Sequence, residues 1–129
     1  MGITGYPYVT GDVLTAPDIN ALVIFDTSTQ TADYTAVLSD SYQELVLMDK
    51  ATAIAFKIPT DASVAFPTGT VITVLNIGVG TCTISAVTPG TTTVASAGGT
   101  SASPTLGQYK SAACIKIGAN SWVIVGGIA

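Results

Sequence analysis

The chain has 129 residues, the length of a single domain. Only 12 side chains are charged (four Lys and eight Asp or Glu), whereas an average domain of this length carries about 32. The net charge of −4, with four isolated lysines and no arginine, argues against a nucleic-acid-binding surface. No apolar run reaches the roughly 18 residues of a membrane span. We expect neighbouring subunits to cover much of so sparsely charged a surface, the alternative being solvation by threonine and serine hydroxyls.

Residues 1–33 are predicted to form an extended attachment arm that carries one short helix. Thr15 as N-cap, Pro17 in the first turn and Asp18 closing a capping box predict this helix over about residues 16–23. A helix of two turns is marginal in water, so it must dock on something. We expect the arm to contact a partner through its apolar and aromatic side chains, which are Tyr6, Tyr8, Leu14, Ile19, Leu22, Val23 and Phe25.

Residues 34–129 are predicted to form an all-β body. Short apolar runs bounded by turn signals predict strands at 34–38, 44–48, 54–58, 71–77, 82–87, 92–95, 112–117 and 121–125. About seven to nine short strands at this spacing favour an antiparallel β-sandwich or small barrel. Residues 71–77 are nearly continuously apolar and are predicted to be buried on both faces, and residues 118–120 predict a hairpin loop. Residues 27–31 show no alternation of strand length.

Histidine-dependent chemistry is excluded because the chain has no histidine. Neither a Ser-His-Asp or Cys-His arrangement nor a histidine-bearing metal site can be built. Cys82 and Cys114 lie in strand-like runs and are predicted to be buried thiols. A disulfide between them is the alternative, and it requires their strands to be neighbours. We expect no cofactor and no metal.

Paired carboxylates are the remaining enzymatic alternative. Asp40 with Asp49, or Glu44 with Asp61, could face each other across strands, as two-carboxylate hydrolysis requires. The three aspartates, however, stand where aspartate normally closes turns through its own backbone. The acidic residues of the arm lack the ligand spacing of a calcium loop. We therefore expect the protein not to be an enzyme.

A few aromatic and charged residues interrupt the predicted strands and loops. Trp122 lies in an apolar strand and is predicted to belong to the core. Lys57 and Lys116 interrupt apolar strands. We expect these lysines to lie on outward faces of the sheets or on edge strands, where they prevent pairing with strands of other molecules. The segment 97–104 is the longest predicted loop, and the candidate receptor contacts around it are Gly98, Gly99, Ser101 and Tyr109.

A series of motifs follows in order between residues 34 and 127. They are YTAVLSDSYQELVLM at 34–48, SVAFPTGTVITVL at 63–75, IGVGTCTI at 77–84, SAGG at 96–99, GQYKSAACIKIG at 107–118 and WVIVGG at 122–127. Their order and spacing resemble a module of bacteriophage tail-fibre and other virion proteins. Residues 11–20, GDVLTAPDIN, likewise resemble a segment near the start of phage fibre proteins.

The resemblance implies a phage virion structural protein, often trimeric, with an attachment arm before a β-rich body. That module usually ends a long fibre, whereas here it fills nearly the whole sequence. We therefore expect a capsid decoration (cement) protein that docks through its arm and stabilises the particle. The alternative is a tail-fibre or tail-tip module that binds a host receptor, either a glycan or a protein.

The partners that the resemblance implies are other copies in a homotrimer, the major capsid protein or a tail protein of the same phage, and, for the alternative, a host surface glycan. No nucleic-acid binding and no membrane insertion are expected. The implied location is the virion, on the capsid exterior or the tail, after assembly in the cytoplasm of the bacterial host.

Overall fold

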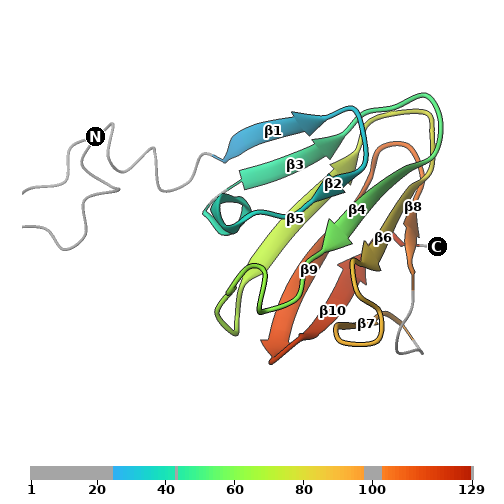
Figure 1. Cartoon of the computed structure of the whole chain (residues 1–129). Coiled ribbons are helices and arrows are strands. Elements are labelled where there is room, and N and C mark those ends of the chain that lie inside the picture. The colour runs from blue at the N-terminus through green and yellow to red at the C-terminus, as the bar shows by residue number, and fades with distance from the viewer. Residues whose placement is uncertain (1–24, 43, 98–102, 129) are drawn as a thin grey trace, which may run out of the picture.

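The computed structural model describes residues 25–42, 44–97 and 103–128 of the chain. These residues form ten β-strands and one short 3-10 helix (Figure 1). The elements in chain order are β1 (Asp26–Gln30), β2 (Tyr34–Thr35), η1 (Leu38–Ser41), β3 (Glu44–Met48), β4 (Ile54–Ile58), β5 (Val71–Asn76), β6 (Cys82–Ala86), β7 (Thr93–Ala95), β8 (Thr105–Leu106), β9 (Lys110–Gly118) and β10 (Ser121–Gly126).

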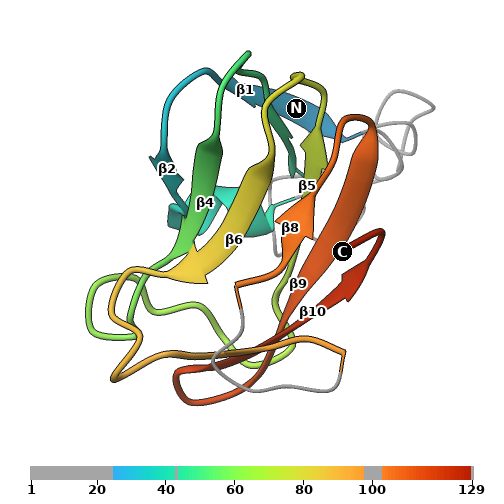
Figure 2. The same ribbon diagram turned by 90° about the vertical axis from the view of Figure 1, so that its right-hand side faces the viewer.

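The strands form two mixed sheets that lie in two layers (Figure 2). The six-stranded sheet has the order β1-β3-β5-β9-β10-β7, and the four-stranded sheet has the order β2-β4-β6-β8. The first six strands alternate between the two sheets: β1, β3 and β5 lie in the six-stranded sheet, and β2, β4 and β6 lie in the four-stranded sheet. Each two consecutive strands therefore make one turn, or coil, of the chain around the core. The predicted all-β class is confirmed.

The prediction of antiparallel sheets is wrong. Five strand pairs are parallel: β1–β3, β3–β5, β2–β4, β4–β6 and β7–β10. Only β5–β9, β9–β10 and β6–β8 are antiparallel among the described strands. Four of these parallel pairs lie among the first six strands, where consecutive strands belong to opposite sheets. Neighbours within a sheet therefore come from successive turns of the chain and run in the same direction.

The core lies between the two sheets. Along each strand every second side chain points inward, and these inward residues are buried. Phe56 of β4 and Ile72 of β5 belong to this core, and the ring of Trp122 packs edge-on against Phe66 with centroids 5.5 Å apart. The prediction that Trp122 is a core residue is confirmed.

The two cysteines are buried free thiols, as predicted. Cys82 lies on β6 of the four-stranded sheet and Cys114 on β9 of the six-stranded sheet. Burial raises the pKa of the Cys82 thiol to about 11 and also raises the pKa of the Cys114 thiol. Both side chains therefore act as small apolar residues of the core.

The strand limits agree with the sequence prediction in the middle of the chain and differ at its start. Residues 44–48 and 54–58 form β3 and β4 as predicted, and Asn120, at φ 48°, closes the predicted hairpin between β9 and β10. The strand predicted at 34–38 is shortened to β2 by η1. The short strands β1 and β8 were not expected, and β1 extends the six-stranded sheet into the predicted arm.

The prediction for Lys116 is wrong, because its side chain points inward and is only 4% exposed. Its Nζ lies 2.7 Å from Oδ1 of Asp61 and also donates to the backbone carbonyl of Phe66. Asn120 and Asp61 exchange two further hydrogen bonds, and the Lys116 hydrogen bond is the main reason why the pKa of Asp61 is lowered. Lys57, in contrast, holds an outward position on β4, as predicted.

The corners between successive coils are stacked closely. Gly80, between β5 and β6, donates its backbone N–H to the carbonyl of Lys50, between β3 and β4. Asn76, at the end of β5, is fully buried and its side-chain nitrogen donates to the carbonyls of Gly80 and Leu106 at 2.9 and 2.8 Å. The Asn76 side-chain oxygen accepts the N–H of Gly78. One side chain thus ties a corner to β8.

Candidate functional site

The outward faces of the two sheets differ in chemistry. On the four-stranded sheet the outward residues are mainly hydroxyl-bearing, with one lysine: Thr35, Ala55, Lys57, Thr83, Ser85 and Thr105. On the six-stranded sheet they are mainly aliphatic. We call this surface the aliphatic face and define it by Leu45, Leu47, Val71, Leu75, Ile115, Val123 and Val125. None of the outward positions of β3, β5, β9 and β10, all of them described, is charged.

The strand register arranges the residues of the aliphatic face in rows across the sheet. Val71 of β5 lies opposite Ile115 of β9, which lies opposite Val123 of β10. Leu47 of β3 lies opposite Leu75 of β5 in another row, and Thr73 of β5 lies between these two rows. Val71 is 49% exposed and the other members are at least partly exposed. Aliphatic side chains gathered in rows on an uncovered sheet are typical of an interaction surface.

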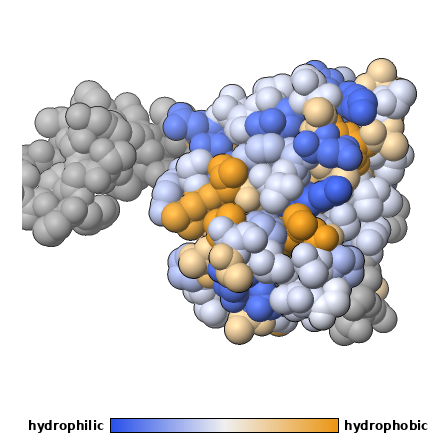
Figure 3. Space-filling view, viewed as in Figure 1, coloured by the Kyte–Doolittle hydropathy of each residue, from blue (hydrophilic) through white to orange (hydrophobic). Residues whose placement is uncertain are grey.

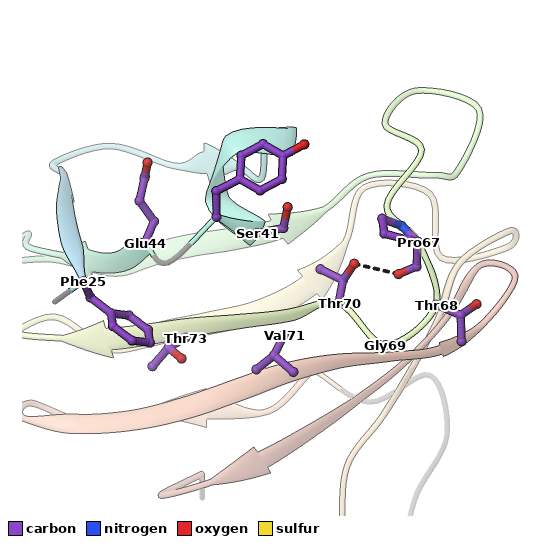
Figure 4. A pocket seen from close by; sticks show the side chains of 10 residues that line it. Phe25, Ser41, Glu44, Pro67, Thr68, Gly69, Thr70, Val71 and Thr73 are labelled. Carbon is purple, nitrogen blue, oxygen red and sulfur yellow. Dashed lines mark hydrogen bonds between the residues drawn. The ribbon is translucent and has the colours of Figure 1, made fainter. Parts of the chain in front are cut away.

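A hollow of about 470 Å³ lies at the end of this face where β5 begins. Its lining comes from the start of β1, the end of η1, the start of β3 and the 67–70 turn (Figure 4). Val71 and Thr73 belong to both the hollow and the outward side of β5, so the two features are contiguous. Figure 3 shows an apolar patch over the region of η1, where Tyr42 and Leu38 are exposed.

A group of acidic side chains lies beside the hollow. Asp40 of η1 is buried and its Oδ2 accepts hydrogen bonds from the Tyr34 hydroxyl at 2.7 Å and from the Val37 N–H at 2.8 Å. Glu44 lines the hollow, and its pKa is raised, first by burial and then by hydrogen bonding and charge repulsion from Asp40, with a further contribution from Asp26. Burial and Asp40 likewise raise the pKa of Tyr34.

The raised pKa of Glu44 predicts a pH dependence of stability. The folded state holds the Glu44 proton more tightly than the unfolded state, so this group's stabilisation is complete below its ordinary pKa of 4.5 and is lost as the pH rises through the folded pKa. Glutamine does not titrate, so the stability of the Glu44→Gln variant does not fall in this way as the pH rises. We expect its melting temperature to match that of the wild type near pH 4 and to exceed it increasingly toward pH 7.

Thermal melts at several pH values, followed by circular dichroism, measure this difference. Asp49→Asn is the matched control, because it removes one negative charge just after the other end of β3. A difference between Glu44→Gln and wild type that stays constant from pH 4 to pH 7 would contradict the assignment.

The carboxylate pairs considered for hydrolysis are not brought together. Asp61 pairs with Lys116, whereas Glu44 lies beside Asp40 and Asp26. Asp49 follows the far end of β3 from Glu44, where its N–H donates to the carbonyl of Gln30. Neither predicted pair is therefore formed, and the acidic neighbours that influence Glu44 are Asp40 and Asp26.

Two of the predicted contact residues lie in the described part of the chain. Phe25 is 50% exposed and lines the hollow. Tyr109 is 73% exposed, with φ 61°, in the turn before β9, and its N–H donates to the carbonyl of Asn76 at the far end of β5 from the hollow. Outside the described residues lie the predicted helix at 16–23 and the contacts Tyr6, Tyr8, Leu14, Ile19, Leu22, Val23, Gly98, Gly99 and Ser101.

The aliphatic face was missed from the sequence, although a signal for it exists. Residues 71–77 were expected to be buried on both faces, and that expectation is wrong because β5 alternates between buried and partly exposed residues. The same near-continuous apolar run nevertheless marks a strand whose outward side is also apolar. The runs ELVLM of β3 and WVIV of β10 carry the same signal.

Within residues 25–42, 44–97 and 103–128 no three Cys, Asp or Glu side chains are grouped so that they could hold a metal ion. In the same ranges no helix has the length and apolarity to cross a membrane. A scan of protein-family models and searches of curated proteins and of solved structures give no match to the chain.

Proposed function

We propose that this chain is a non-enzymatic structural protein of a bacteriophage particle, acting as a capsid decoration (cement) protein. The observation that carries the proposal is the aliphatic face, an uncharged surface that a free monomer would leave in water. The scarcity of charged side chains and the resemblance of residues 34–127 to a module of virion proteins support it.

In the proposed mechanism, copies of the chain associate as a trimer and dock through their N-terminal residues on the major capsid protein. Stabilisation comes from burial of apolar area across contacts between subunits, at up to roughly 25 cal/mol per Å² before association costs are subtracted. A standard contact buries about 1,600 Å². Many such contacts over a capsid would resist its rupture.

Truncation tests the docking segment. Because β1 pairs with β3, the cut belongs before Phe25 and not at the predicted boundary after residue 33. We expect residues 25–129 to keep the β-rich circular dichroism spectrum of the full chain and to lose co-sedimentation with undecorated particles. Full-length protein, mixed with the same particles, is the control. Undiminished occupancy by the truncated chain would show that docking lies elsewhere.

A tail-fibre or tail-tip module that binds a host receptor is the second candidate. The observation that favours it is Tyr109, a highly exposed aromatic residue held at positive φ, which is uncommon for a residue other than glycine. Excess purified protein should then block adsorption of the phage, and Tyr109→Ala should remove the block. Counting copies in purified particles separates the two candidates, since hundreds indicate the capsid and a handful the tail.

A further inference from the structure

We infer that the aliphatic face is the surface through which copies of this chain associate with one another. The face lies on the outside of the six-stranded sheet and joins the hollow at the start of β5. This surface would form the contact of the proposed oligomer, and its assignment rests on the proposed function only for the expectation that copies associate.

The absence of charge on the face favours a second copy as its occupant. When identical surfaces meet about a twofold axis, or lie close around a threefold axis, each charge near the axis comes close to its own copy and repels it. The outward positions of β3, β5, β9 and β10 avoid this repulsion because every residue at these described positions is uncharged. The four-stranded sheet is less suited, since it would bring together the two copies of Lys57.

The size of the face is compatible with an oligomer contact. The outer surface of the whole six-stranded sheet, of which the aliphatic face forms the four middle strands, spans about 24 Å across strands about 4.8 Å apart. Strands of five or six residues are about 17–20 Å long, so the projected area of the whole sheet is about 400 Å² and that of the four middle strands about 250–300 Å². A standard contact needs about 800 Å² of accessible surface on each partner. Phe25 and Tyr42, exposed at the hollow, extend the apolar surface toward this size, and Glu44, which also lines the hollow, places one carboxylate at the edge of the contact.

Lysine substitutions on the full chain test the inference. Val71 and Val125 are 49% and 44% exposed in the single chain, so a lysine at either position leaves the folded protomer undisturbed but places a charge in the proposed contact. Val87→Lys is the matched control, because Val87 is 48% exposed and follows β6 of the other sheet. Melting curves for the three variants check that each one folds.

Sedimentation velocity and native mass spectrometry over a range of concentrations provide the readout. We expect the wild type and Val87→Lys to be dimers or trimers, and we expect Val71→Lys and Val125→Lys to raise the dissociation constant at least about tenfold. A monomeric wild type at high concentration would overturn the inference, as would equal weakening by Val87→Lys.

Particle binding separates this inference from the proposed function. If the wild type is monomeric, decorates particles and loses decoration on Val71→Lys, the face binds a particle protein; the inference then fails and the proposed function stands. If the wild type forms the oligomer and Val71→Lys breaks it, while no particle binds the wild type, the inference stands and the proposed function fails.

Discussion

Replacing Gly80 with alanine is expected to lower the free energy of unfolding by about 3 kcal/mol, at the upper end of the range for overpacking substitutions. A Cβ atom at position 80 would lie 1.8 Å from the backbone carbonyl oxygen of Thr52. Both residues lie in corners between strands, and Gly80 also donates its N–H to the carbonyl of Lys50. Because the obstructing atoms are backbone atoms, relief requires the stacked corners to separate and their hydrogen bonding to weaken.

Gly90→Ala is the matched control, since no atom lies within 4 Å of the Cβ that it would add. We expect its free energy of unfolding to stay within about 0.5 kcal/mol of the wild type. Urea unfolding of the three proteins, followed by tryptophan fluorescence from Trp122 in the core, measures both changes. Equal stability of the Gly80→Ala and Gly90→Ala variants would show that the corners are not closely stacked.

The Asn76→Ala variant is expected to lose about 3–5 kcal/mol of stability. Its side chain makes three hydrogen bonds in a fully buried position, to the carbonyls of Gly80 and Leu106 and from the N–H of Gly78. Each buried partner left without a hydrogen bond costs about 1–3 kcal/mol. The loss is therefore much larger than the roughly 1 kcal/mol of a single average hydrogen bond.

Gln108→Ala provides the comparison for Asn76, because it removes an exposed amide that makes only a 3.4 Å hydrogen bond to the carbonyl of Ile77. We expect that control to change stability by less than about 0.5 kcal/mol. Chemical denaturation gives both values from the same experiment. A loss for Asn76→Ala no greater than that for Gln108→Ala would mean that solvent or neighbouring groups replace its hydrogen bonds.

Local pattern predicted the strands well where the strands are apolar on the inward side. The limits of β3 and β4 follow from runs such as IAFKI, in which alternate residues are buried. β1, with the sequence DTSTQ, was not predicted as a strand because it is a polar edge strand with only one neighbour in its sheet. Its position comes from pairing with β3, which no local pattern contains.

The order and direction of the strands could not be predicted because they depend on contacts distant in the sequence. The alternation of apolar and polar residues along a strand indicates which side chains face the core. It does not indicate which other strand is its neighbour in the sheet. The same limit applies to single residues. Lys116 interrupts an apolar strand as a surface residue would, and only the fold reveals that Asp61 and the carbonyl of Phe66 meet it inside.

Of the candidate site, the sequence singled out one lining residue of the hollow as a partner contact and missed the aliphatic face next to it. Phe25 was expected to contact a partner, and the structure places it at the rim of the hollow. The aliphatic face itself is formed by residues from four strands, such as Leu47, Val71, Ile115 and Val123. Each appeared in the sequence as an ordinary apolar residue, since only sheet order brings them together.

The coiled path of the first six strands has a consequence for how the protein folds. Ile54 of β4 pairs with Cys82 of β6 only after the chain has crossed to the other sheet and returned. Native pairings of this kind close long loops before any contact offsets the lost entropy, which places folding of such chains in the range of milliseconds to seconds. The β9–β10 hairpin is the most local of the pairings, and it is therefore the natural nucleus on which the earlier strands assemble.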